Sequence, residues 1–226
     1  MATLATTHWE AVTPGARDLL SLLGQLALLR SSYLGGGTAL ALRLGHRISQ
    51  DLDLFANIET LDEGLRRSLV EELRKDHAVN LLQDSPLGLV LEVDGQAVSF
   101  FSYGYPLLEP TDLVSGIEIA GLLDIGLMKL DAIAGRGMRK DFYDLYFIAP
   151  RISLDELFGR SAEKYPKLHG FGMRVLTALV DFDIADQQDE PTLLLPIGWD
   201  EVKAFFEAEA RGLGQEWFSL SDSDSD

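Results

Sequence analysis

Two aspartates that alternate along a short segment are candidate ligands for a divalent cation. Residues 51–55 read DLDLF, the polar and apolar alternation typical of a half-buried β-strand. Successive side chains of a strand point to opposite faces, so Asp51 and Asp53 would share one face. Mg²⁺ or Mn²⁺ binds such carboxylates and completes its shell with water and substrate phosphate. The alternative is an exposed strand face that binds nothing.

A glycine-rich turn precedes this strand. The sequence GGGT at 35–38 runs into the apolar stretch 39–44, which predicts a short helix capped by Thr38. Backbone N–H groups at a helix N-terminus can bind phosphate, and the helix dipole favours an anion there. Alone, this turn indicates only flexibility. Its short distance in sequence from the two aspartates changes this interpretation. It predicts that Gly36, Gly37 and Thr38 bind a triphosphate beside a metal site.

A second group of charged residues lies in a later segment with helical periodicity. Lys129 has Ile125 four residues before it and Ile133 four residues after it, so it lies on an apolar stripe. Its ammonium group either extends past the apolar surface to water or reaches into a cleft and neutralises phosphate charge. Asp141 and Asp144 share one helical face, a spacing that is also typical of a surface ion-pair cluster.

Hydrophobic periodicity and turn signals predict the elements that position these residues. They indicate a small mixed sheet in the N-terminal half and helices in the C-terminal half. Helices are expected at 16–30, 39–44, 63–76, 122–134, 139–149, 171–182 and 199–210, with another after the capping box Ser153–Glu156. Strands are expected at 51–55, 79–82, 89–93 and 96–101.

The last two of these strands are joined by Asp94-Gly95, a typical two-residue hairpin loop. The register that this loop imposes places Glu92 and Ser99 on one face of the sheet.

Charge is unevenly distributed along the 226 residues. The net charge is −17, but residues 181–226 contain 13 acidic and 2 basic residues, a net charge of −11, which leaves −6 for residues 1–180. Nucleic acid is held by lysine and arginine, so the total argues against such a partner. Cations gather at 43–75 and 136–167, however, so a local basic face is compatible with the sequence.

Composition also limits the class of protein. The chain has no cysteine, which excludes disulfides and thiolate metal sites, and its four histidines lack zinc-ligand spacing. The most apolar run, 19–29, is shorter than the roughly 20 residues that span a bilayer. With no signal-peptide pattern, we expect a soluble cytoplasmic protein without a membrane partner.

The two motifs together resemble a known family. GGTALALRLGHRISQDLDLF at 36–55 resembles the first motif of the AbiEii/AbiGii-type nucleotidyltransferase toxins. They are a branch of the polymerase-beta-like superfamily, whose hallmark is a Gly-Gly/Ser-Thr turn followed by D-x-D. KLDAIAGRGMRKDFYDLY at 129–146 resembles the family's downstream block, K-L-x-A-I followed by R-x-x-x-[KR]-D-x-x-D-L.

This resemblance implies an α+β fold. A polymerase-beta-like nucleotidyltransferase core with a small mixed sheet would occupy 1–115, and a helical C-terminal part at 116–220 would complete the active-site cleft. The acidic segment 221–226 is predicted to be a disordered tail.

The implied activity is transfer of a nucleotide from a nucleoside triphosphate (NTP) to an acceptor hydroxyl, with Mg²⁺ or Mn²⁺ as the cofactor. The family includes toxins of toxin–antitoxin and phage-defence systems, some acting on the 3′ end of tRNA. The implied partners are therefore an NTP, tRNA and a cognate antitoxin. Two alternatives stay open: a protein or small-molecule acceptor, and a catalytically degenerate binding module.

The resemblance also assigns residues to roles. Asp51 and Asp53 would bind the metal and, with Lys129 and Asp144, form the catalytic set. The nucleotide-binding residues would be Gly36, Gly37, Thr38 and Lys129. Further candidates are Asp141 and Arg136 in the downstream block and His46 in the first motif, where the alternative is an ordinary loop histidine.

One position departs from the family pattern. Many polymerase-beta-like enzymes carry a third carboxylate on a later strand, where it helps to activate the attacking hydroxyl. The matching strand here offers Ser99. Glu92, across the hairpin on the same face, is either a substitute or an ordinary strand glutamate. The third metal ligand and the general base therefore stay unassigned.

Overall fold

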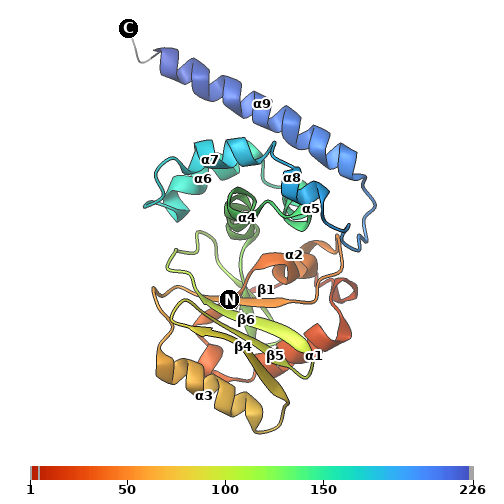
Figure 1. The fold of residues 1–226 in the computed structure, drawn as a ribbon, viewed down its shortest axis with the longest axis vertical. Helices are drawn as coiled ribbons and strands as arrows, with labels where there is room; N and C mark the ends of the chain where they lie inside the picture. Colours follow the sequence, from red (N-terminus) through yellow and green to blue (C-terminus); the bar gives the residue numbers. More distant parts are fainter. Residues whose placement is uncertain (1, 5, 224–226) are drawn as a thin grey trace. The chain divides into compact units, whose positions relative to one another are not determined.

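The computed structural model describes residues 2–4 and 6–223, and the side chains of residue 4 and of residues 6–215. The chain divides into two compact units, residues 1–125 and residues 126–226 (Figure 1). The division falls within helix α4 (Leu122–Arg136). The first unit thus extends past residue 115 and includes the strand that follows it.

The first unit contains the sheet. Its strands are β1 (Ala2–Thr3), β2 (Ser32–Leu34), β3 (Leu52–Ala56), β4 (Val79–Ser85), β5 (Gly88–Val93), β6 (Gln96–Ser102), β7 (Asp112–Val114) and β8 (Ile117–Ile119). Its helices are α1 (Pro14–Leu23), α2 (Gly36–Leu44) and α3 (Glu63–Arg74), with the short 3₁₀ turns η1 (Trp9–Ala11) and η2 (Ala27–Leu29).

Within the described residues these strands form one mixed sheet in the order β1-β7-β8-β2-β3-β6-β5-β4. β3 lies inside the sheet, antiparallel to β2 and parallel to β6. The prediction of a mixed sheet is confirmed, but the sheet is larger than expected. β1, β2, β7 and β8 have only two or three residues each, too few to show an alternating pattern.

The β5–β6 hairpin has the predicted register. Asp94 and Gly95 both have positive φ, 50° and 82°, as a type I′ turn requires. Val90 pairs with Ser99, and Glu92 pairs with Ala97. The prediction that Glu92 and Ser99 share one face is therefore confirmed.

Helix α1 ends earlier than predicted. It begins after the capping residue Thr13, but it stops at Leu23, and η2 replaces the rest of the expected helix 16–30. The reason is a close backbone approach, since a Cβ at Gly24 would lie 1.8 Å from the Ser115 carbonyl oxygen. Continuing leucines had suggested a longer helix.

The core of the first unit lies between the sheet and two helices. α1 contacts β6 and α2 contacts β3. Leu20, Leu40, Leu52 and Leu54 are fully buried there, and burial of such apolar side chains is the main stabilising term. α3 begins at the predicted cap, where Asp62 accepts a hydrogen bond from the Leu65 N–H, and it contacts β4.

The second unit is helical. After α4 it contains α5 (Arg139–Ile148), α6 (Leu154–Lys164), α7 (Phe171–Ala178), α8 (Asp183–Asp186) and α9 (Trp199–Ser223). α9 contacts α5 and α7 (Figure 1). Aromatic rings fill this core: Phe142 of α5 packs against Phe182, Trp199 and Phe206 at centroid distances of 5.3–5.8 Å. The predicted cap of α6 is confirmed, because Ser153 accepts from the Glu156 N–H.

Two helix predictions in this unit are wrong in length. The helix expected at 171–182 ends at Ala178, and the one expected at 199–210 continues to Ser223. Leu213 is buried one turn beyond Ala210, so the apolar stripe continues past the predicted end of the helix. Residues 221–223 of the predicted disordered tail belong to α9, and residues 224–226 lie outside the described part. No helix of the described residues is long and apolar enough to cross a membrane.

Candidate active site

The glycine turn lies against β3 at Asp53. β2 leads into Gly35, whose N–H donates to the Asp53 carbonyl oxygen at 2.9 Å. Gly36 has φ +62°, and a Cβ at this position would lie 2.9 Å from Asp53 Oδ2. Because both the left-handed backbone and the lack of space exclude a side chain, only glycine fits. The turn and the carboxylate are thus brought together, as the spacing predicted.

Helix α2 starts earlier than expected, and Thr38 is not its cap. Gly35 is the N-cap residue, and Thr38 lies in the first turn, fully buried. The Thr38 hydroxyl donates to the Asp51 carbonyl oxygen at 2.5 Å and lies 2.8 Å from the Ser49 hydroxyl. The hydroxyl therefore joins α2 to the segment entering β3, and its binding to phosphate stays a prediction.

The two aspartates differ in their surroundings. Asp51 is exposed and directly precedes β3, whereas Asp53 lies within the strand and is half-buried between the buried Leu52 and Leu54. On the parallel neighbour β6, Asp53 pairs with Ser99. The serine therefore occupies the position beside Asp53 where the family pattern led us to look for a third acid.

Glu92 has a partner of its own. Its carboxylate accepts a hydrogen bond from Asn80 Nδ2 at 2.8 Å, so it joins β5 to β4. This contact favours the ordinary strand role for Glu92.

The donor set suits Mg²⁺ bound jointly with a nucleotide. Among the described residues, no three Asp, Glu or His side chains gather as metal ligands. Two carboxylates are nevertheless enough when phosphate and water supply the other ligands. Because position 36 has no room for a Cβ, the backbone of the glycine turn lies directly beside the Asp53 carboxylate. A phosphate bound by the turn would therefore meet a metal bound by Asp53.

Arg47 is a further basic residue that borders the glycine turn. A Cβ at Gly37 would lie 2.4 Å from Arg47 Nη2, so this guanidinium group lies against the start of α2. Arg47 is buried, and its Nη1 donates to the Ile48 carbonyl oxygen at 3.1 Å. Its place within the first motif, four residues before Asp51, was the signal that could have identified it.

Aromatic side chains continue the face that carries Asp53. Phe55 lies two residues further along β3, and its ring is 5.8 Å from Tyr33, 5.5 Å from Phe101 and 5.3 Å from Tyr103. Phe55, Phe101 and Tyr103 are half-buried. Such a surface can stack a nucleotide base.

The remaining candidate of the first motif, His46, is fully buried in the loop after α2. Direct contact with a nucleotide would need this loop to open.

In the second unit, the residues of the downstream block form a buried ionic network. Lys129 Nζ lies 2.8 Å from Asp141 Oδ1 and 2.6 Å from Asp144 Oδ2. Arg136 Nε donates to Asp141 Oδ2 at 2.8 Å. The Asp141 and Asp144 side chains are 0% exposed and that of Lys129 is 4% exposed. The alternatives of an ammonium extended to water and of a surface cluster are therefore wrong.

The network changes the titration of Asp141. Burial raises the pKa of this carboxyl group, but the Lys129 and Arg136 charges and hydrogen bonds outweigh burial, so the net pKa is lowered. Asp144 shares the same ammonium group.

Stability should accordingly fall in acid. An aspartate has a pKa near 3.9 in an unfolded chain, and the folded value is lower, so unfolding takes up a proton in this range. The contribution of Asp141 is fully present well above about pH 4 and is lost as pH falls through the folded pKa. We expect the gap in unfolding free energy between the wild type and Asp141→Asn to be constant from about pH 7 to 5 and to shrink below about pH 4. Urea unfolding at each pH measures it, and a gap that widens in acid would contradict the assignment.

The mixed sheet with a glycine turn against an aspartate of an inner strand defines a polymerase-beta-like nucleotidyltransferase fold. A solved structure with this fold is MenT4, a nucleotidyltransferase toxin of Mycobacterium tuberculosis, with a TM-score of 0.51 and 19% identity over 88% of this chain and 86% of that one. Residues 18–107 match the family model described as nucleotidyl transferase AbiEii toxin, type IV TA system. An uncharacterized protein of Aquifex aeolicus is 37% identical over 199 residues, covering 86% of this chain and 94% of that protein. The chain belongs to the AbiEii family of nucleotidyltransferase toxins.

Proposed function

We propose that the protein transfers a nucleotide from an NTP to an acceptor hydroxyl. The acceptor oxygen bonds to the α-phosphorus, and the bond from that phosphorus to the oxygen bridging the β-phosphate breaks. Pyrophosphate leaves with the bonding electrons, and the hydroxyl proton passes to solvent. The observation that carries this proposal is the contact between the Gly36 backbone and the Asp53 carboxylate at the start of α2.

The chain's own residues would hold the nucleotide. Backbone N–H groups of the Gly36–Gly37 turn would bind the β- and γ-phosphates. Asp51 and Asp53 would hold Mg²⁺ or Mn²⁺, which when bound neutralises phosphate charge and lowers the pKa of the attacking hydroxyl. The half-buried ring of Phe55, on the same face as Asp53, would stack the base.

Lys129 and Asp144 would contribute to the reaction through their charges. Lys129 would balance the negative charge that builds up as pyrophosphate leaves, and Asp144 would orient its ammonium group. The 2.6 Å contact between Lys129 and Asp144 supports the second role.

We propose tRNA as the acceptor and growth inhibition as the outcome, because the chain belongs to a toxin family. A protein or small-molecule hydroxyl is the second candidate, and one observation favours it. Several cations of 136–167 are engaged within their own unit: Arg136 with Asp141, Arg139 with backbone carbonyls of α8, and Arg160 with Glu163. Fewer charges are then available to bind a phosphate backbone.

The test is incubation of the purified protein with each α-³²P-labelled NTP, Mg²⁺ and either total tRNA or total cell protein. We expect label on one acceptor, and a loss of about a hundredfold or more with Asp53→Asn. Asp18→Asn removes the same charge from an exposed position of α1 and should keep full activity.

The outcomes separate the candidates. Label on tRNA supports the first acceptor and label on protein the second. Equal labelling by wild type and Asp53→Asn would refute the assigned site. NTP binding without transfer to any acceptor would indicate the binding module, which Ser99 in place of a third acid favours. Growth arrest on expression should require Asp53.

A further inference from the structure

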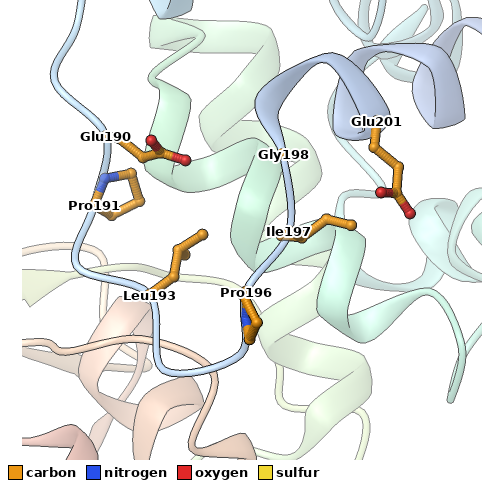
Figure 2. Close-up of a pocket in the computed structure, with 7 residues that line it drawn as sticks. All are labelled: Glu190, Pro191, Leu193, Pro196, Ile197, Gly198 and Glu201. Atoms are coloured by element: carbon orange, nitrogen blue, oxygen red, sulfur yellow. The ribbon is translucent and has the colours of Figure 1, made fainter.

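The second unit contains a hollow that none of the candidate catalytic residues lines. Its volume is about 660 Å³, and it lies between the 190–198 loop and the start of α9. Figure 2 shows Glu190 and Glu201 on its two sides, with apolar side chains between them. The wall residues used below are Glu190, Pro191, Leu193, Pro196, Ile197 and Glu201.

Both carboxylates are held by tyrosines of α5. The Tyr143 hydroxyl donates to Glu190 Oε1 at 2.7 Å, and the Tyr146 hydroxyl donates to Glu201 Oε1 at 3.4 Å. Burial raises the pKa of both tyrosines, and the adjacent glutamates raise it further, so both hydroxyl groups stay protonated as donors. Each carboxylate still has acceptor positions left, because a carboxylate can accept several hydrogen bonds.

The segment that forms the walls of the hollow is strongly acidic. Residues 181–215 contain nine acidic and two basic residues, a net charge of −7. One of the two, Lys203, is already paired with Asp186 and Asp200. Nucleic acid and other anions are therefore repelled from this part of the second unit, and a cation is attracted.

Apolar surface accompanies the charge. Pro191, Leu193, Pro196 and Ile197 line the hollow, and the neighbouring Leu194 and Leu195 are 39% and 45% exposed. A small inorganic cation would leave this surface exposed to water. A long basic side chain matches both features, because its methylene groups cover apolar surface while its charged end meets a carboxylate.

We propose that this hollow docks a basic segment of a partner protein. One arginine or lysine would place its charged end between Glu190 and Glu201, and an apolar neighbour would pack on Leu193 and Ile197. Arginine suits the site best, because its planar group can donate two parallel hydrogen bonds to one carboxylate. This docking does not depend on the proposed transferase activity.

The experiment measures binding of a fluorescein-labelled peptide of alternating leucine and arginine to the full chain by anisotropy. Two further peptides serve as comparisons: one in which glycine replaces leucine and one in which glutamate replaces arginine. We expect the leucine–arginine peptide to bind most tightly, and Glu190→Gln/Glu201→Gln to weaken it by about tenfold or more. Glutamine can still accept from each tyrosine, so the loop should keep its conformation.

The matched control is Asp189→Asn/Glu207→Gln, which removes the same charge from exposed positions of the same segment that do not line the hollow. We expect it to weaken binding by less than about threefold. Equal losses in the two double variants would mean general attraction to an acidic surface and would overturn the proposal. So would equal binding of the glycine–arginine peptide, because the apolar wall would then contribute nothing. Self-association in sedimentation that is lost in Glu190→Gln/Glu201→Gln would assign the hollow to a second copy instead.

Discussion

Substituting alanine for Gly36 is expected to reduce nucleotidyl transfer by about a hundredfold or more while the chain stays folded. The new Cβ would lie 2.9 Å from Asp53 Oδ2, so either the carboxylate or the turn must shift. Position 36 also has φ +62°, and a left-handed conformation costs an alanine about 1–2 kcal/mol. Misplacement of a metal ligand by about 1 Å is enough for a loss of this size.

Gly45→Ala is the matched control for this prediction. Gly45 ends the same helix, has the same φ of +62°, and its Cβ would lie 2.6 Å from His8 Nδ1. The backbone strain is therefore similar, but the clash involves His8 rather than Asp53, the aspartate proposed to bind the metal. Urea unfolding should give similar losses for both variants, whereas NTP turnover should fall steeply only for Gly36→Ala. A comparable fall in turnover for both would show that helix strain, not the contact with Asp53, limits the reaction.

The sequence predicted the central part of the fold because that part has local signals. Alternation over five or more residues identified β3 and the β5–β6 hairpin, and the Asp94-Gly95 turn set the register because both residues need positive φ. β2 and β8 could not be predicted, since three-residue strands show no period and are defined by their neighbours. The early end of α1 depends on contact with a turn about 90 residues away, which no local pattern reports.

For the site, residue types were easier to predict than surroundings. The glycine turn and Asp53 were expected to meet, and they do. The hydrogen bond from the Thr38 hydroxyl to the Asp51 carbonyl oxygen could not be predicted, because this bond depends on the residue at which α2 begins. The burial of Lys129 could not be predicted either. An apolar stripe is compatible both with an ammonium group in water and with one in a buried ionic network, and the two carboxylates that bind Lys129 lie on another helix.

Lys129→Met should destabilise the second unit by about 3–5 kcal/mol, the range for removing one partner of a buried ion pair. The substitution keeps most of the side-chain volume, so the cost comes from charge rather than from a cavity. Asp141 would keep Arg136, but Asp144 would lose the ammonium group 2.6 Å away, with its carboxylate fully buried. Since a domain is stable by only about 5–15 kcal/mol, urea unfolding should show a large shift. Lys140→Met, at a partly exposed position of α5, is the control and should change stability by less than about 0.5 kcal/mol.

The double variant Lys129→Met/Asp144→Asn separates stability from chemistry. Neutralising Asp144 removes the buried charge that has lost the nearby Lys129 ammonium group, so the double variant should be more stable than Lys129→Met alone, a coupling that a double-mutant cycle measures. If Lys129 also balances phosphate charge, the double variant will fold and still fail to transfer a nucleotide, with the loss in kcat rather than in KM. A folded double variant with full activity would confine Lys129 to the structure of the second unit. Equal stability of Lys129→Met and Lys140→Met would instead show that the buried network contributes nothing to folding. That outcome would contradict the stabilising role that we infer from two carboxylates within 2.8 Å of one ammonium group.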